Sequence, residues 1–214
     1  MKHRFATSAV LLGAVLAACL VRAQELSPVS LPPPQTEGGK PLMQALKLRA
    51  TSRAFAPDPL PPQTLANLLW AAWGINRPQE GKRTAPSARN WQEIEVVVVT
   101  STGAYSYDAK GNALTPLVAG DLRALAGTQE FVKDAPVTLV LVAETSRMQG
   151  GPDAQPMAYA DAAFVSENVY LFCASEGLAT GVRASLDRPA LAKALKLSAS
   201  QLVVFAQSVG FPKR

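Results

Sequence analysis

The 214-residue sequence predicts an α+β domain in which helices pack on a mainly antiparallel sheet. Two apolar, β-branched runs, residues 94–100 and 137–143, predict buried strands. A longer apolar segment, residues 159–176, has the length of a helix, and Gly177 directly after it is suited to end one. Hairpins and helices are mixed along the chain, without the regular alternation of a doubly wound parallel sheet.

Turn residues and local periodicity predict the remaining elements. In chain order they are a helix at residues 42–49, a helix from Pro61-Pro62 to Gly74, a polar turn-rich stretch at 77–90, a hairpin around the turn at 108–111, a helix at 117–125, a loop at 177–185, a short helix that Asp187 caps and that runs to 197, and a closing strand at 201–209.

The N-terminal residues have the pattern of an export signal. A basic start precedes an apolar run at residues 9–21 that is too short to span a bilayer, and residues 21–23 offer a small-x-small cleavage site. Residues 1–23 therefore predict a signal peptide and a periplasmic or secreted protein without a membrane span. The alternative is a bacterial lipoprotein box at residues 16–19, in which Cys19 would carry a lipid anchor.

A linker and one domain are expected after the signal. Residues 24–40 contain a proline triplet and a glycine pair, which predicts a stiff spacer. The domain is expected at residues 41–214. Loss of residues 1–23 removes three basic residues and no acid, so the net charge falls from +5 to +2. Such a small charge, without basic clustering, argues against nucleic-acid binding.

The processed chain would contain no histidine, because His3 is the only one. Ser-His-Asp and Cys-His catalysis and His-containing metal sites are therefore excluded, and no metal is predicted. Carboxylate-pair catalysis remains open. For an enzyme of this composition, a bound organic cofactor is the economical source of reactivity.

One short segment is suited to hold a phosphate. Arg49, Thr51 and Arg53 alternate with small residues, so in an extended chain they point to the same side. Two guanidinium groups and a hydroxyl can bind a phosphate group together. The alternative is that the arginines only complement the carbonyl end of the preceding helix.

Two other segments carry candidate ligand contacts. Ser87 and Asn90, in the loop at residues 84–90, have donors and acceptors that suit the edge of a heteroaromatic ring. The alternative is that they are simply turn formers. Backbone N–H groups at residues 177–185 could face a ligand, or could belong to an ordinary glycine-capped connection. Cys173 is expected to be a buried structural thiol.

Together, five segments resemble the flavin-dependent nitroreductase family, in the branch that includes small exported members and azoline-oxidising enzymes. The similarity covers about residues 42–212. The segments are residues 49–55, 69–77, 83–90, 176–180 and 209–212. The resemblance implies a three-layer α/β/α sandwich around a mainly antiparallel central sheet.

The resemblance also implies a cofactor and an assembly. FMN would bind without a covalent bond, in a homodimer whose clefts lie between the subunits. The flavin would carry the chemistry, so no side chain is predicted to be catalytic. The residues implied to bind the cofactor are Arg49, Ala50, Thr51, Arg53, Pro86, Ser87, Asn90, Arg183, Ala184 and Lys213.

The function expected from this resemblance is that of an exported FMN-dependent oxidoreductase. It would transfer two electrons to small electron-poor acceptors such as nitroaromatics or quinones. One alternative is a flavin-dependent dehydrogenase or oxidase that passes electrons to oxygen or a quinone, and another is a non-catalytic flavin-binding protein. The electron donor stays open, because free NAD(P)H is not expected outside the cytoplasm.

Overall fold

The computed structural model describes residues 26–149 and 153–213, so the predicted signal peptide and Cys19 lie outside the described residues. In chain order the helices and strands are β1 (Val29–Ser30), α1 (Leu42–Leu48), α2 (Pro62–Trp73), β2 (Ile75–Arg77), β3 (Lys82–Arg83), β4 (Ile94–Val99), β5 (Gly103–Asp108), β6 (Ala113–Ala119), β7 (Val137–Glu144), α3 (Ala154–Glu176), β8 (Ala179–Arg183), α4 (Arg188–Ala194) and β9 (Gln201–Gly210).

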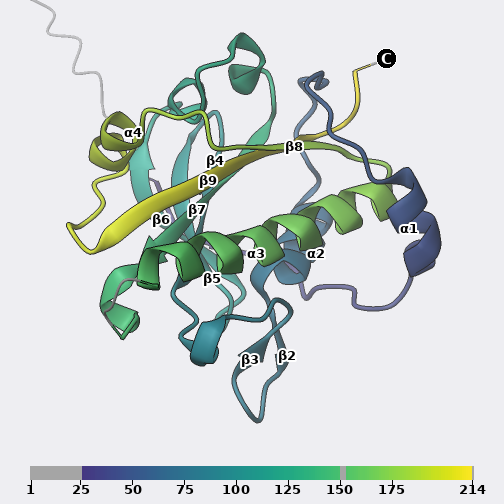
Figure 1. Ribbon diagram of the computed structural model, residues 1–214. Coiled ribbons are helices and arrows are strands. Elements are labelled where there is room, and N and C mark those ends of the chain that lie inside the picture. The colour runs from purple at the N-terminus through teal and green to yellow at the C-terminus, as the bar shows by residue number, and fades with distance from the viewer. Residues whose placement is uncertain (1–25, 150–152, 214) are drawn as a thin grey trace, which may run out of the picture.

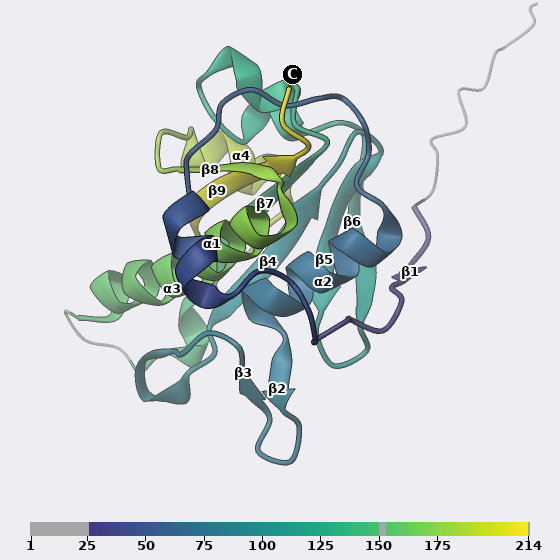
Figure 2. The ribbon, with the colours of Figure 1, turned by 90° about the vertical axis from the view of Figure 1, so that its right-hand side faces the viewer.

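One large sheet organises the chain (Figure 1). Its seven strands run in the order β1-β6-β5-β4-β7-β9-β8, and every neighbouring pair is antiparallel. Strands β2 and β3 form a separate small hairpin that projects from the domain (Figure 2). The predicted α+β class with an antiparallel central sheet is confirmed.

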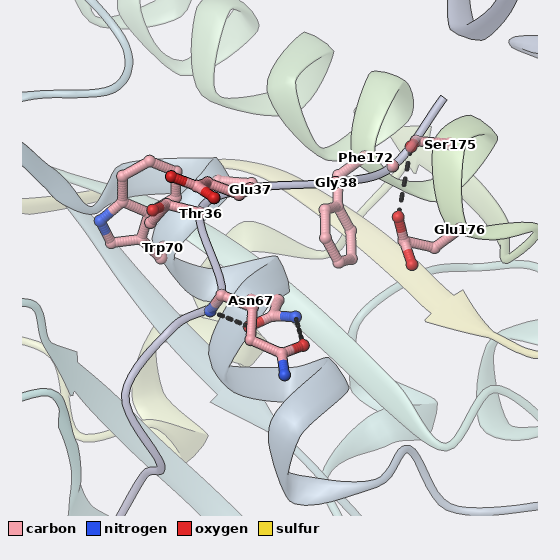
Figure 3. A pocket seen from close by; sticks show the side chains of 11 residues that line it. Thr36, Glu37, Gly38, Asn67, Trp70, Phe172, Ser175 and Glu176 are labelled. Atoms are coloured by element: carbon pink, nitrogen blue, oxygen red, sulfur yellow. Dashed lines mark hydrogen bonds between the residues drawn. The ribbon is translucent and has the colours of Figure 1, made fainter. Parts of the chain in front are cut away.

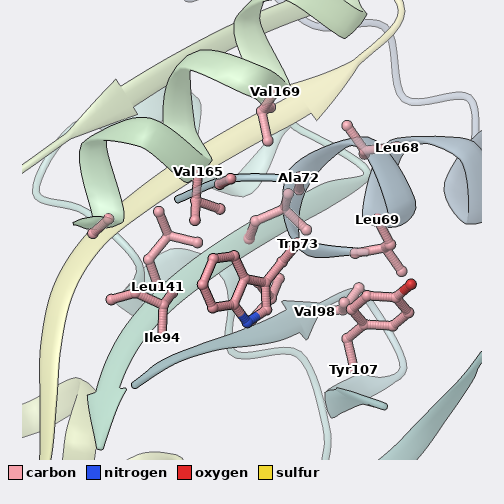
Figure 4. Close-up of a cluster of buried hydrophobic side chains, with 14 of the residues drawn as sticks. Leu68, Leu69, Ala72, Trp73, Ile94, Val98, Tyr107, Leu141, Val165 and Val169 are labelled. Atoms are coloured by element: carbon pink, nitrogen blue, oxygen red, sulfur yellow. The ribbon is translucent and has the colours of Figure 1, made fainter. Parts of the chain in front are cut away.

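Both faces of the sheet are buried, as the side chains of β4 show. Ile94, Val96 and Val98 face a core built with α2 and α3 (Figure 4). Val97 and Val99 point the other way, into a core that includes Leu191 of α4 and Val132. Because successive side chains of a strand alternate between faces, an uninterrupted apolar run buries both faces. The predicted three-layer arrangement is therefore confirmed.

Helix α3 is the longest helix and ends as predicted. Gly177 adopts the left-handed conformation, with φ 73°, and the N–H of Leu178 donates to the carbonyl of Cys173 at 2.8 Å. These contacts satisfy carbonyls that the last helical turn would otherwise leave free. The predicted cap of the next helix is also confirmed, because the Asp187 carboxylate accepts from the N–H of Ala190 at 3.0 Å.

Two predicted elements are wrong. Residues 117–125 are not a helix: β6 continues to Ala119, and only Arg123–Leu125 form a short 3₁₀ turn. Their pairing with β5 overrides the local pattern. The predicted loop at residues 177–185 contains strand β8, which pairs with β9 at the sheet edge.

The segment predicted to be a linker lies along the domain where it is described. Val29–Ser30 pair with β6, and the Asn112 side chain donates to the carbonyls of Leu31 and Pro32. Gln35 is held by Asn67 of α2 through its N–H, at 2.8 Å. None of the helices within residues 26–149 and 153–213 is both long and apolar enough to cross a bilayer.

Candidate functional site

The segment that contains Arg49, Thr51 and Arg53 is fixed against strand β8. Helix α1 stops at Leu48, and Arg49 already has extended torsion angles. The N–H of Ser52 then donates to the carbonyl of Thr180 at 2.8 Å. A Cβ atom at Gly181 would lie 2.7 Å from the Ser52 carbonyl oxygen, so only glycine lets the two backbones approach this closely. We call residues 49–53 the arginine strip.

The side chain of Tyr170 joins the arginine strip to α3. Its hydroxyl lies 2.9 Å from Oγ1 of Thr51 and accepts from the N–H of Val182 at 3.1 Å. The Arg49 guanidinium lies over the Tyr170 ring, 5.3 Å from its centroid. One buried aromatic residue therefore orients both a hydroxyl and a cation of the arginine strip.

A third cation lies next to the arginine strip. The backbone N–H of Lys213 donates to the carbonyl of Ala54, and Phe55 pairs with Pro212. In the part of the chain that the structure describes, no acidic side chain forms an ion pair with Arg49, Arg53 or Lys213. Arg49, Arg53 and Lys213 thus belong to adjoining backbone segments beside the oriented Thr51 hydroxyl, and groups of these kinds can bind a phosphate together.

The second predicted segment, residues 84–90, forms a tight turn that continues to Gln92. Ser87 Oγ accepts from the N–H of Gln92 at 3.0 Å, and Asn90 Oδ1 accepts from the Gln92 side chain at 3.1 Å. Arg89, Asn90 and Gln92 have φ values of 50°, 56° and 49°. Such values are uncommon for residues with a Cβ, and they persist only where surrounding contacts impose them.

Two buried acids lie beneath this turn. The N–H of Ala88 donates to Asp161 of α3 at 2.7 Å. Glu93, the last residue before β4, is fully buried next to Asp161. Burial raises the pKa of Glu93 to about 7, and the neighbouring Asp161 carboxyl acts in the same direction.

Two adjoining pockets lie beside α3. The first, of about 270 Å³, is walled by Trp70 and Phe172 and has a polar rim that includes Asn67 and Glu176 (Figure 3). The second, of about 360 Å³, shares both aromatic residues and extends to Thr84 at the start of the turn. The pockets therefore connect the turn with the face of α3 that solvent reaches.

The structure brings only part of the predicted site together. Arg49, Ala50, Thr51, Arg53 and Lys213 lie at one end of α3, near Tyr170. Pro86, Ser87 and Asn90 belong to the turn anchored at Asp161. Asp161 and Tyr170 are nine residues apart on α3, which is about 14 Å along the helix axis.

Arg183 and Ala184 lie at the end of β8. The Arg183 side chain is buried and donates to the Ala126 carbonyl at 2.6 Å and to Ser208 Oγ at 2.9 Å. Burial lowers the pKa of this guanidinium to about 10. Its side chain thus stabilises the domain interior, whereas the predicted role of the amides at 183 and 184 stays a prediction.

Sequence reasoning missed four residues that organise the site. They are Tyr170, Gln92, Glu93 and Asp161. Of these, only Tyr170 could have been suspected from the sequence, because a tyrosine among the buried positions of a helix needs a partner for its hydroxyl. Gln92, Glu93 and Asp161 organise the site through contacts that cannot be read from the sequence.

Comparison with known proteins agrees with this geometry. The family model described as the nitroreductase family matches residues 46–211. The chain belongs to the nitroreductase family. No protein with a curated description matches the chain.

Solved structures show the same fold. A proposed nitroreductase from Ralstonia eutropha JMP134 is 40% identical, with a TM-score of 0.84, over 87% of this chain and 90% of that chain. A proposed nitroreductase from Desulfovibrio desulfuricans, solved in complex with FMN, is 18% identical with a TM-score of 0.61, over 83% and 89% of the two chains. The Ralstonia protein supports the family assignment over most of the domain. The Desulfovibrio protein, at its lower identity, shows the fold alone.

No group of three or more His, Cys, Asp or Glu side chains within residues 26–149 and 153–213 could hold a metal ion. Cys173 is fully buried, and burial raises the pKa of its thiol to about 12. The candidate site of this nitroreductase-family oxidoreductase consists of the arginine strip and the turn.

Proposed function

We propose that the chain is an exported FMN-dependent oxidoreductase that passes two electrons to small electron-poor acceptors such as nitroaromatics or quinones. The observation that supports this function is the Thr51 hydroxyl held by Tyr170 beside Arg49, on a segment that adjoins Lys213 in a domain of the nitroreductase family. Bound FMN would supply the two-electron chemistry. No side chain of the protein has to serve as the redox group.

The arginine strip would hold the FMN phosphate. The Tyr170 hydroxyl accepts from the Val182 N–H, and its own proton can then be donated to Thr51 Oγ1. The Thr51 proton is thereby left for a ligand oxygen. Arg49 is held over the Tyr170 ring, so part of its conformational entropy is lost before the ligand binds.

A homodimer would complete the site. The arginine strip and the turn lie at different positions along α3. In a dimer, the arginine strip of one copy would meet the turn of the other copy. Exposed apolar side chains mark the surface that would pack between the copies. They are Leu42, Met43, Leu46 and Leu48 at α1 and Met157 and Phe164 on α3. Exposed large apolar side chains such as these are typical of a surface that a partner covers.

The first experiment is the absorbance spectrum of the purified protein. We expect yellow protein that releases FMN on denaturation. After anaerobic reduction, a nitroaromatic or a quinone should reoxidise the flavin. Colourless protein that takes up no added FMN would contradict the proposal.

The phosphate site is tested by the double variant Thr51→Ala, Arg53→Ala. Loss of one cation and one hydroxyl should weaken FMN binding at least tenfold, which corresponds to about 1.4 kcal/mol. The matched control is Thr115→Ala, Lys133→Ala, which removes one hydroxyl and one cationic group from exposed positions elsewhere. Equal FMN affinity of the two variants would exclude the arginine strip as the phosphate site.

Export is tested separately by cell fractionation and mass spectrometry. A processed periplasmic or secreted protein that begins at Gln24 supports the signal-peptide prediction. An N-terminal Cys19 that carries lipid supports the lipoprotein alternative. Unprocessed protein in the cytoplasm would refute both.

A further inference from the structure

Glu93 is a buried carboxyl group that lacks a donor. Its side chain is fully buried directly before β4. No N–H or O–H group of the described residues donates to either of its carboxyl oxygens. An ionised carboxylate in such a place is strongly unfavourable. The group therefore needs a proton or a cationic partner.

The group that Glu93 meets is a second carboxyl. Asp161 on α3 is 3% exposed and lies within hydrogen-bonding reach. The nearby cation, Arg147, is already engaged, because it donates to the Gln92 carbonyl and pairs with Glu95. Two carboxyl groups can form a hydrogen bond only if one of them is protonated. Because Asp161 accepts from the Ala88 N–H, Glu93 is the natural donor.

We propose that Glu93 and Asp161 hold one proton between them, and that this carboxyl pair fixes the turn of residues 87–92 to α3. The turn needs such an anchor, because three of its residues have positive φ. Asp161 holds the start of the turn through Ala88, and Glu93 follows its end. The shared proton thus joins both ends of the strained segment to one helix.

The pair should respond to pH. The charged groups that face Glu93 are Asp161 from α3 and Arg147 from the 3₁₀ turn after β7. Burial raises the pKa of Glu93 to about 7, Asp161 adds to this rise, and Arg147 opposes it. Above that pH the proton leaves, and two adjacent carboxylates repel each other. Glu93 and Asp161 are positioning residues, because they act on the turn and not on a ligand. Only the link from the turn to FMN rests on the proposed function.

The test is a carbon-13 NMR titration of the carboxyl groups in the purified protein. We expect one glutamate signal with a midpoint near pH 7, and the Ala88 amide signal should move with the same midpoint. Glu93→Gln should abolish both changes, because its carboxamide donates to Asp161 at every pH. Glu130→Gln, at an exposed position in the 3₁₀ turn before β7, is the matched control and should keep both.

A second variant tests the coupling between the two acids. Asp161→Asn should lower the Glu93 midpoint, because an amide can donate to the ionised carboxylate. A Glu93 midpoint near its ordinary value of 4.5, or an Ala88 amide that does not follow Glu93, would overturn the proposal. Protein that takes up no added FMN but still shows the coupled titration refutes the proposed function and supports the shared proton.

Discussion

The hydroxyl of Tyr170 lies 2.9 Å from Oγ1 of Thr51, so a helix that covers the sheet contacts the segment expected to hold a phosphate. The same hydroxyl accepts from the N–H of Val182 in β8. Three parts of the chain that are distant in sequence therefore meet at one oxygen atom. This contact makes the geometry of the arginine strip dependent on the position of α3.

Tyr170→Phe should weaken FMN binding and lower stability. The substitution removes the orienting partner of Thr51 and leaves the Val182 N–H without its acceptor, at an expected loss of about 1 kcal/mol in the free energy of unfolding. Fluorescence titration with FMN and urea unfolding measure the two effects. Tyr159→Phe, on the same helix, is the control, because its ring packs against Phe205 away from the strip. Unchanged FMN affinity in Tyr170→Phe would remove Tyr170 from the site.

Phe164→Glu should convert the proposed dimer to monomers. Phe164 on α3 is 50% exposed, and a charge there would have to be buried in the interface. Sedimentation velocity measures the assembly state. Leu117→Glu, on a 37% exposed residue of β6, is the control that should leave the assembly intact. A dimer that survives Phe164→Glu would place the interface elsewhere.

Stability should fall as the pH rises from about 4.5 to about 7. Over this interval the folded protein keeps the Glu93 proton, whereas the unfolded chain has already lost it. The free energy of unfolding should therefore decrease by at most about 1.4 kcal/mol per pH unit and level off above the folded-state pKa. Urea unfolding of wild type and Glu93→Gln over this range isolates the contribution, because the variant lacks it. Parallel pH profiles of the two proteins would argue against the raised pKa.

The thiol of Cys173 should resist alkylation in the folded protein. It is fully buried, and burial raises its pKa to about 12, although a hydrogen bond to Thr180 acts in the opposite direction. Because the thiolate is the nucleophile, iodoacetamide should react only after unfolding. A Cys19→Ser background leaves one thiol to follow by mass spectrometry. Equal rates with and without urea would show that the site is open.

The sequence predicted the central strands, because β-branched runs such as residues 94–99 have one physical interpretation in a chain of this length. It also predicted the end of α3, where Gly177 adopts the one conformation that excludes most other residues. It mispredicted residues 117–125, because Val118 and Ala119 pair with β5 through contacts that local periodicity does not contain. Non-local pairing decided the structure there.

The candidate site was only partly predictable for a related reason. Alternation of Arg49, Thr51 and Arg53 is visible in the sequence, and in the structure the backbone of Lys213 bonds to Ala54, directly after these residues. Asp161 and Tyr170 were not visible as partners, because each contacts a residue more than seventy positions away. Short-range patterns therefore indicated the candidate ligand-binding groups but not the residues that contact them.

Gly181 has a consequence for how this family member can evolve. Any larger residue at this position would push the Ser52 carbonyl away from β8 and carry its neighbours with it. Substitution of Gly181 is therefore not tolerated where the two backbones meet. The alternating side chains of the arginine strip beside it remain free to vary. Adaptation to a differently charged ligand would have to proceed by replacing those side chains, without remodelling the chain path beneath them.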